Sequence, residues 1–449
     1  MHPVSRSAEP PRQGLRGLCL SGRGLRASFP QRTCIAADVA RMRPLTRLSV
    51  TTVAALTLVV SGSGSESGAA PKVPRQPLPD GPVYAGIPGA LPHGFTYRYN
   101  RLSPGWPVRP RSVQHPIRGA FIDPRGPDDN GLSGYHFGID VSVDDHHSDR
   151  GAPPGLSHRV YALDSGVARE PSNVRLRRCG NRRVEVGHFS YWHVSPIVPA
   201  GRHVAAGQQI GWTCTGEWHV HVSEWQRYRG RRIWVNPLHP RGAFRPYTDT
   251  APPVVSQIVF TTPPRQPWEP TVSLRQPDSS LQLSRTRLHG LVDIRVRAAD
   301  PQSYLGFLAR NPAWPTQWTP YELETEIRSM RSGRLVLRRT AFRADQLPQT
   351  PYLVHYAPGT VENDPMSECV GPPALARCDG VTWLRALSRF RLEYWNTTHV
   401  PNGVYRVTVA AVDIAGNVGS LSVTVVVDNR PGAATAALSG APRKRPTSR

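Results

Sequence analysis

The pattern that most constrains this chain is a series of short segments in which apolar and polar residues alternate, separated by glycine and proline. The 449 residues include 39 glycines and 47 prolines. Alternation with a period of two is typical of strands, and Gly and Pro end such segments in turns. The segments LVDIRVRAAD and VYRVTVAAVDIAGNVGSLSVTVVVDN show it, the second with a Gly/Asn turn between two strands. The sequence therefore predicts a mainly β fold built from antiparallel sheets.

One of these segments carries two histidines. Between Glu217 and Ser223, His219 and His221 are two residues apart, so on a strand they project from the same face. The opposite face would carry Trp218, Val220 and Val222. We therefore expect a strand with one face in the core and the other lining a groove, where one histidine binds a metal and the other meets a substrate.

A second motif, HxxxD, contains His136 and Asp140. A straight strand would separate these side chains by about 13 Å, which is too far for one ion. Gly138 lies between them and could permit a bend that brings them together. Zn²⁺ binds imidazole nitrogen and carboxylate oxygen, and a catalytic site uses three protein ligands and leaves a fourth position for water.

His193, in YWHV, completes a set of five candidate residues with His136, Asp140, His219 and His221. No single motif is specific, because the chain has 16 histidines. His146 and His147 lie in the Pro/Gly-rich stretch DDHHSDRGAPPG, which is typical of a solvated loop. His188 and His203 lack a partner pattern, and we expect them to satisfy local hydrogen bonds.

From about Pro116 to Pro237 the chain resembles the lysostaphin-type or LytM-type zinc metallopeptidases, which cut peptide bonds in bacterial cell walls. YHFGIDVSV is similar to the HxGxD segment of that family, and VEVGHFSYWHVSPI to its strand with a YxHL histidine. VPAGRHVAAGQQIGWT is similar to its glycine-rich hairpin, and HVHVSEW followed by WVNPL to its HLHFE and VNPL segments. The same order of motifs makes the resemblance specific.

This resemblance implies an antiparallel β-sheet domain like a duplicated hybrid motif, with one Zn²⁺ ion. The metal ligands of the family fall on His136, Asp140 and His221, and its two catalytic histidines fall on His193 and His219. The implied reaction is metal-assisted hydrolysis, in which zinc activates water and the two histidines assist.

The chain also departs from the family pattern. The loop before the HxH strand carries Cys214, Glu217 and Trp218 where the family has small residues, and Glu224 falls one position later than the glutamate of the family. The loop between Val143 and Val160 is longer than usual. We expect these differences to affect specificity and to leave the metal ligands intact.

Residues 42–70 have the pattern of a secretory signal peptide. A basic start is followed by an apolar run from Leu48 to Val60 and then by small residues. This run is too short to span about 30 Å of hydrocarbon, so we expect cleavage, no transmembrane anchor afterwards, and a secreted or cell-wall location. Residues 1–41 are rich in Arg and Pro, and we interpret them as an N-terminal extension from a misassigned start.

Four cysteines remain after the leader is removed. Cys179 and Cys214 lie in the peptidase-like region, and Cys369 and Cys378 lie in the later one. An even number of cysteines favours disulfides in an oxidising compartment. We predict the pairs Cys179–Cys214 and Cys369–Cys378, because the other connectivities would tie the two regions together. A zinc finger is the rival interpretation, but no CxxC spacing occurs.

The formal net charge is +23. Most of this charge is arginine scattered over the leader, loops and tail without a recognised nucleic-acid-binding motif, so we expect no nucleic-acid partner. Long-range attraction would instead hold a secreted basic protein near anionic wall polymers.

Composition divides the chain into successive parts. An extended, Pro/Gly-rich lead-in (71–112) precedes the peptidase-like domain (113–247), and a Pro/Thr-rich linker (248–270) overlaps the start of a second β region (254–430). That region resembles bacterial immunoglobulin-like or fibronectin-like β-sandwiches in its closing strands, and residues 431–449 form a basic tail that we predict to be disordered. In the second β region, Asp293 and Asp300 could suggest a calcium site, but we expect them to lie on a solvated strand edge.

Together, the motifs and the signal peptide lead us to expect a secreted zinc endopeptidase, a hydrolase whose substrates are the peptides of peptidoglycan. The first alternative is a non-catalytic LytM-like protein that binds the wall or regulates a partner enzyme. The second is a secreted peptidase that acts on other proteins. Retention of all five candidate residues favours the peptidoglycan endopeptidase.

Overall fold

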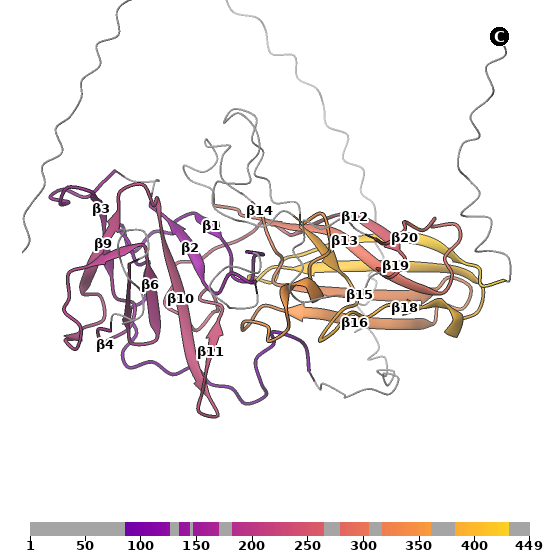
Figure 1. The fold of residues 1–449 in the computed structure, drawn as a ribbon, viewed down its shortest axis with the longest axis horizontal. Helices are drawn as coiled ribbons and strands as arrows, with labels where there is room; N and C mark the ends of the chain where they lie inside the picture. The colour runs from indigo at the N-terminus through magenta and orange to yellow at the C-terminus, as the bar shows by residue number, and fades with distance from the viewer. Residues whose placement is uncertain are drawn as a thin grey trace, which may run out of the picture. The chain divides into compact units, whose positions relative to one another are not determined.

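The computed structural model describes residues 86–125, 134–143, 147–169, 182–264, 279–304, 317–360 and 382–430. All of them belong to one compact unit, Pro71–Arg449. Strands dominate, and the only helices among these residues are the short 3₁₀ turns η3 (Tyr352–Val354) and η4 (Thr397–His399). The prediction of a mainly β fold with antiparallel sheets is confirmed (Figure 1).

Eleven strands form the first β region, which falls within the predicted domain of residues 113–247. They are β1 (Ile117–Gly119), β2 (Ile139–Ser142), β3 (Leu156–Tyr161), β4 (Gly166–Val167), β5 (Arg183–Val186), β6 (Phe189–Trp192), β7 (Val194–Pro196), β8 (His203–Val204), β9 (Gln209–Cys214), β10 (His219–Tyr228) and β11 (Arg231–Val235). The largest sheet has the order β1-β2-β10-β6-β5, with β11 also paired to β10. The other strands form the small sheets β3-β9-β7 and β4-β8. Strand β10 is therefore central to the first region.

The alternating pattern of β10 explains its position. Val220 and Val222 are fully buried in the core below the sheet, whereas His219 and His221 project from the other face. Arg229 and Gly230 have φ angles of 50° and 78° at the turn between β10 and β11, which is the left-handed conformation that two-residue hairpin turns require.

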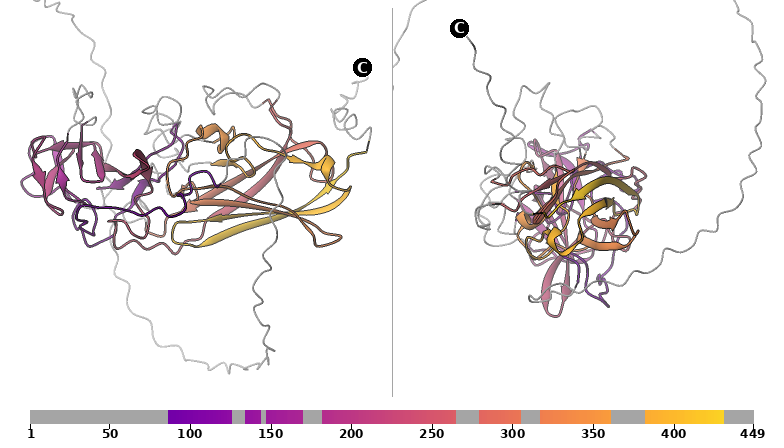
Figure 2. Two further views of the ribbon diagram at one scale, coloured as in Figure 1. Left: turned by 90° about the horizontal axis from the view of Figure 1, so that it is seen from below. Right: turned by 90° about the vertical axis from the view of Figure 1, so that its right-hand side faces the viewer.

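Nine strands form the second β region. They are β12 (Val254–Thr261), β13 (Leu291–Pro301), β14 (Gln317–Trp318), β15 (Glu322–Ser329), β16 (Leu335–Arg343), β17 (Trp383–Arg385), β18 (Trp395–Asn396), β19 (Gly403–Val412) and β20 (Val418–Val427). One sheet has the order β12-β13-β14, with β17 and β18 also on β13, and the other has the order β16-β15-β19-β20. The long strands of this region, drawn in orange and yellow, are seen from two further directions in Figure 2.

The predicted linker of residues 248–270 requires a correction. Residues Val254–Thr261 form β12, which pairs with β13 along its whole length. The sequence VVSQIVFT alternates enough to bury Val255, Ile258 and Phe260. Of the predicted linker, only the short segment 248–253 precedes β12, and residues 236–253 separate β11 from β12.

The predicted lead-in of residues 71–112 is also more than an extended approach to the first β region. Residues 86–112 contain no named strand or helix, but Trp106 and Val108 are fully buried in the core. The indole Nε1 of Trp106 donates to the carbonyl of Pro246, at the other end of the region. This segment therefore contributes packing that its Pro/Gly-rich composition does not reveal.

The expectation that Asp293 and Asp300 lie on a solvated strand edge is wrong. Both are buried, with exposed fractions of 1% and 5%. Strand β13 is an interior strand, paired with β12 on one side and with β17 and β18 on the other. The carboxylate of Asp293 forms ion pairs with Arg295 and Arg385. Asp300 instead lies beside two other carboxylates, those of Asp249 and Asp413.

Hydrogen bonds connect the two β regions. Gln302 exchanges two bonds with the backbone of Ile117 in β1, and the backbone amide of Thr319 donates to Asp123. The hydroxyl of Tyr356 donates to the carbonyl of Ile122. These contacts involve buried groups, so the two regions are packed together rather than separated by an extended linker.

Several predicted features lie outside the described residues. They are the N-terminal extension, the signal peptide, Cys179, Cys369, Cys378, His146 and the basic tail. Cys214 is disulfide-bonded, and its partner also lies outside the described residues. Within the described part of the chain, no helix has the length and apolar character needed to cross a membrane.

Candidate metal centre

The sheet order brings the predicted residues together. Strand β10 lies between β2 and β6, so His221 is directly opposite Asp140 on one side and Trp192 on the other. His136 lies three residues before the start of β2, and His193 immediately follows β6. The five predicted residues therefore come from three neighbouring strands and their ends.

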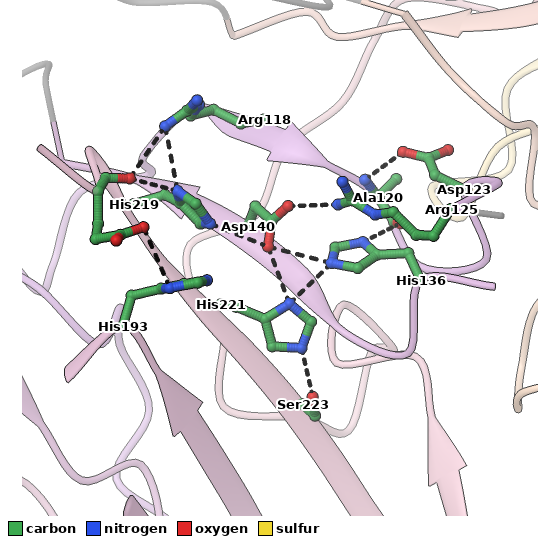
Figure 3. Close-up of polar contacts among 11 residues, drawn as sticks. Arg118, Ala120, Asp123, Arg125, His136, Asp140, His193, His219, His221 and Ser223 are labelled. Atoms are coloured by element: carbon green, nitrogen blue, oxygen red, sulfur yellow. Dashed lines mark hydrogen bonds and ion pairs between the residues drawn. The ribbon is translucent and has the colours of Figure 1, made fainter. Parts of the chain in front are cut away.

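Three of their polar atoms converge on one point (Figure 3). Nε2 of His136 lies 2.8 Å from Nδ1 of His221, and both lie close to Oδ1 of Asp140, at 3.1 and 3.0 Å. All three residues are buried. This His-Asp-His group could hold a metal ion.

Hydrogen bonds behind the two imidazoles set which nitrogen faces this point. Nδ1 of His136 lies 2.7 Å from the carbonyl oxygen of Ala120, which only accepts, so Nδ1 carries the proton and Nε2 has the free lone pair. Nε2 of His221 lies 2.7 Å from the hydroxyl of Ser223. When Nε2 donates to Ser223, Nδ1 of His221 becomes an acceptor as well.

The charge state of these groups also suits a cation. Burial and the charge of Arg125 lower the pKa of His136 to about 4, so its ring is neutral at pH 7. Burial alone would raise the pKa of Asp140, but His136, Arg125 and His219 together lower it well below its usual value. Arg125 donates to Oδ2 of Asp140 at 2.6 Å and leaves Oδ1 to face the two imidazoles. Two imidazole nitrogens and a carboxylate oxygen are the donor atoms that zinc prefers.

The expected role of Gly138 needs refinement. Its φ is not among the positive values, so a left-handed bend is not what requires glycine. A Cβ at this position would lie 2.5 Å from the carbonyl oxygen of Val222 and 2.7 Å from Nε2 of His221. Glycine is needed because β10 approaches the backbone here, and this close approach is what lets His136 and Asp140 reach the same point.

His219 lies beside the three converging atoms. Its Nε2 is 3.7 Å from Oδ1 of Asp140, and its Nδ1 is 2.5 Å from the carbonyl oxygen of Glu217. The same Nδ1 lies 3.2 Å from Nη1 of Arg118, which can only donate. We assign the proton to Nδ1 because the carbonyl oxygen is the nearer partner, and Nε2 is then an acceptor on the side of Asp140. Burial, followed by His193 and Arg118, lowers the pKa of His219 well below its usual value against the opposing effect of Asp140. A neutral ring in this position can accept a proton.

His193 is the outermost member of the group. Its ring centroid lies 4.5 Å from that of His219, and its Nδ1 lies 3.3 Å from the carboxylate of Glu217. The φ angle of His193 is 63°, in the left-handed region that residues other than glycine rarely adopt. Such backbone strain is found most often at functional sites.

Exposure increases from the convergence point outward. The side chains of His136 and Asp140 are 4% and 9% exposed, whereas those of His219 and His193 are 14% and 24% exposed. The three converging atoms are thus enclosed, and the two additional histidines lie on the side that solvent reaches. This is the arrangement expected if a substrate approaches past His193 and His219.

The prediction that Trp218 points into the core is wrong. Strand β10 begins at His219, and Trp218 precedes it with a φ of 48°. The reversal removes Trp218 from the alternation, and its side chain is 39% exposed. Trp218 therefore lies at the surface next to His219 instead of below the sheet.

Three other histidines named in the sequence analysis lie outside the site. His147 and His203 are exposed, and Nδ1 of His188 bonds to Asp164 at 2.7 Å. Glu224, which falls one position late for the family pattern, is fully buried on the other face of β10 and accepts from Tyr99 and His239. None of these residues contacts the three converging atoms.

Sequence reasoning missed the residues that support the site. Arg118, Arg125 and Ser223 contact its imidazoles and carboxylate, and Glu217 contacts His193. Only Ser223 carried a signal, since it follows His221 by two residues and so shares its face of the strand. The arginines come from β1 and the turn after it, and no spacing rule links them to the histidines.

Comparisons of the chain with protein-family models, curated proteins and solved structures find no match.

Proposed function

We propose that this protein is a secreted zinc-dependent endopeptidase that hydrolyses peptide bonds of bacterial cell-wall peptidoglycan. The observation that carries the proposal is the convergence of His136, Asp140 and His221 on one point, with His219 and His193 beside it on the more exposed side. The ordered LytM-like motifs and the signal-peptide pattern support the substrate and the location.

The three converging residues fit a zinc ion and would be its ligands. Three acceptor atoms within 3.1 Å of one another repel unless a cation or a proton lies between them. When bound, zinc would supply a Lewis acid and lower the pKa of a water molecule to about 7. Arg125 and the carbonyl of Ala120 orient Asp140 and His136 toward this position.

The two remaining histidines would divide the proton chemistry. His219 is held with an unprotonated Nε2 beside Asp140, which makes it the general base that takes a proton from the attacking water. His193, oriented by Glu217, would hydrogen-bond to the oxygen of the scissile carbonyl as negative charge develops on it. Glu217 is then a positioning residue, which acts through His193.

The proposal is tested by the release of soluble peptides from purified peptidoglycan. The His219→Ala variant should lose about 10²-fold to 10⁴-fold in rate, the usual contribution of a general base, and should retain its zinc. His203→Ala is the matched control, because His203 is exposed on the separate β4-β8 sheet. A general protein substrate such as casein, supplied in parallel, distinguishes a general peptidase from a wall enzyme.

Two results would count against the endopeptidase. A zinc-loaded parent that binds peptidoglycan but releases nothing from any wall type would support the non-catalytic alternative. Equal rates for the His219→Ala variant and the parent would remove His219 from the mechanism.

A further inference from the structure

A second group of converging side chains, all of them acidic, contains none of the residues of the histidine site. Asp249, Asp300 and Asp413 each offer a carboxylate oxygen, and these three atoms lie within 4.8 Å of one another. Asp249 belongs to the segment between β11 and β12, Asp300 lies near the end of β13, and Asp413 directly follows β19. The exposed fractions of the three residues are 8%, 5% and 1%. Three segments distant in sequence thus bury three carboxylates together.

Among the residues that the structure describes, no positive charge compensates them. Within the described residues, none of the three carboxylates forms an ion pair with an arginine, lysine or histidine. Oδ1 of Asp300 is buried and has no hydrogen-bond partner. Burial of a charge without a partner is strongly unfavourable, so the charge of Asp300 must be offset here by a proton or by a cation.

Burial and the neighbouring charges all raise the pKa of Asp300. Burial, followed by the charges of Asp249, Asp413 and Asp123, raises the pKa of Asp300 to about 9. The charged neighbours are all carboxylates. This position therefore favours the binding of a positive species, either a proton or a metal cation.

Hydrogen bonds hold the other two carboxylates in place. Asp413 accepts from the backbone and side-chain nitrogens of Asn417 at 2.8 and 2.7 Å. The side chain of Asn417 also donates to the backbone carbonyl of Asp249, and the amide of Ala251 donates to Oδ1 of Asp249. Every donor is neutral, and each carboxylate oxygen has a second lone pair. The bonds therefore position the carboxylates without neutralising them.

We propose that Asp249, Asp300 and Asp413 bind a calcium ion. Calcium takes six to eight oxygen ligands in flexible geometry, whereas magnesium demands a near-ideal octahedron and is usually bound through one or two carboxylates. Three carboxylates from three separate segments suit the larger ion. The group contains no imidazole or thiolate, so it does not suit zinc. This inference does not depend on the proposed peptidase activity.

A calcium ion here would stabilise the junction between the two β regions. Two residues beyond Asp300, Gln302 bonds to the backbone of Ile117 in β1. Asp300 is paired across strands with Trp318, and the next residue, Thr319, donates to Asp123. Fixing Asp300 and Asp249 would therefore restrict the chain on both sides of this junction.

The test is calorimetric titration of the full chain with CaCl₂. The protein is first stripped of metal, dialysed and given one equivalent of zinc, so that the histidine site is not the site measured. The parent should bind about one calcium ion, as three converging carboxylates require. Its melting temperature should rise by about 3 °C or more when calcium exceeds the dissociation constant about 100-fold.

Two substitutions locate the binding. Asp300→Asn and Asp413→Asn preserve shape and remove charge, so each should abolish the calcium heat and the shift in melting temperature. Asp428→Asn is the matched control, because Asp428 pairs with Arg430 at the surface and lies outside the group. It should bind calcium as the parent does.

Three results would overturn the proposal. The first is the absence of any calcium heat or melting shift in a parent whose circular dichroism is native. The second is unchanged calcium binding by Asp300→Asn, which would place the ion elsewhere. The third is a melting shift with magnesium equal to or larger than that with calcium.

Discussion

At the scale of single residues, the candidate zinc site depends on contacts behind the atoms that face the metal position. His136 is fixed by Ala120, Asp140 by Arg125 and His221 by Ser223. These bonds select the ring nitrogen or carboxylate oxygen that points inward, and partners of this kind are what raise the metal affinity of a preformed site.

Ser223 provides the cleanest test of this idea. Ser223→Ala removes the partner of His221 Nε2 and should weaken zinc affinity by about 10-fold to 100-fold, measured by competition with a chromophoric chelator. Ser422→Ala is the control, because Ser422 lies exposed on β20 and bonds only to Thr408. Equal zinc affinity for Ser223→Ala and the parent would show that Ser223 does not orient the ligand.

Spacing placed two histidines on one face of a strand, whereas the grouping of His136, Asp140 and His221 was implied by the family resemblance, and no pattern indicated the residues that support them. His219 and His221 could be placed on one face because a strand has a fixed period of two. Arg125 and Glu217 could not be found this way, since their contacts with Asp140 and His193 depend on how turns fold back over the strands. Glycine at position 138 was expected to permit a bend in the chain. In the structure it is needed because strand β10 passes close to its backbone, and no local sequence pattern shows such an approach.

At the scale of secondary-structure elements, alternation located the strands better than composition located the segments between them. The clear alternation in β13, β19 and β20 predicted strands that the structure contains. The Pro/Thr-rich composition around residue 254 concealed β12, and the Pro/Gly-rich lead-in concealed the buried Trp106. Burial of these residues is a tertiary effect, and composition reports only local preference.

The element η3 provides a pH test of packing. His355 follows η3, is buried and packs near Phe342, and burial lowers its pKa to about 3. The unfolded chain therefore binds a proton that the folded chain does not between about pH 6.5 and pH 3. Stability from this group is complete above pH 6.5 and is lost as the pH falls, by up to about 1.4 kcal/mol per pH unit.

Urea unfolding at a series of pH values measures this slope. His355→Gln should flatten it between pH 6 and pH 4, while His399→Gln, at the exposed last residue of η4, should leave it unchanged. A parent whose free energy of unfolding is constant over that range would show that His355 does not resist protonation.

At the scale of the whole molecule, the two β regions form one unit and are not two domains separated by a linker. Buried hydrogen bonds connect Ile117 with Gln302, Ile122 with Tyr356, and the side chain of Asn236 with Ala344. Sequence analysis expected a linker here because a Pro/Thr-rich segment is the usual sign of a domain boundary. Contacts between distant strands are invisible to that criterion.

Truncation tests the dependence of the first region on the second. A protein ending at Thr248 loses these bonds and the packing around them, so it should melt at least about 10 °C below the full chain, given about 1 kcal/mol per bond, or accumulate as insoluble protein. Removal of residues 431–449 alone is the control and should leave the melting temperature unchanged. A soluble truncated protein with the melting temperature of the full chain would show that the first region is independent.

The central claim of a zinc site made by His136, Asp140 and His221 is tested most directly by the zinc content of metal-stripped protein after dialysis against zinc. The parent and His219→Ala should each retain about one zinc ion per chain, whereas His136→Ala and His221→Ala should retain almost none. A parent without zinc, or variants of His136 and His221 that retain it in full, would contradict the site itself.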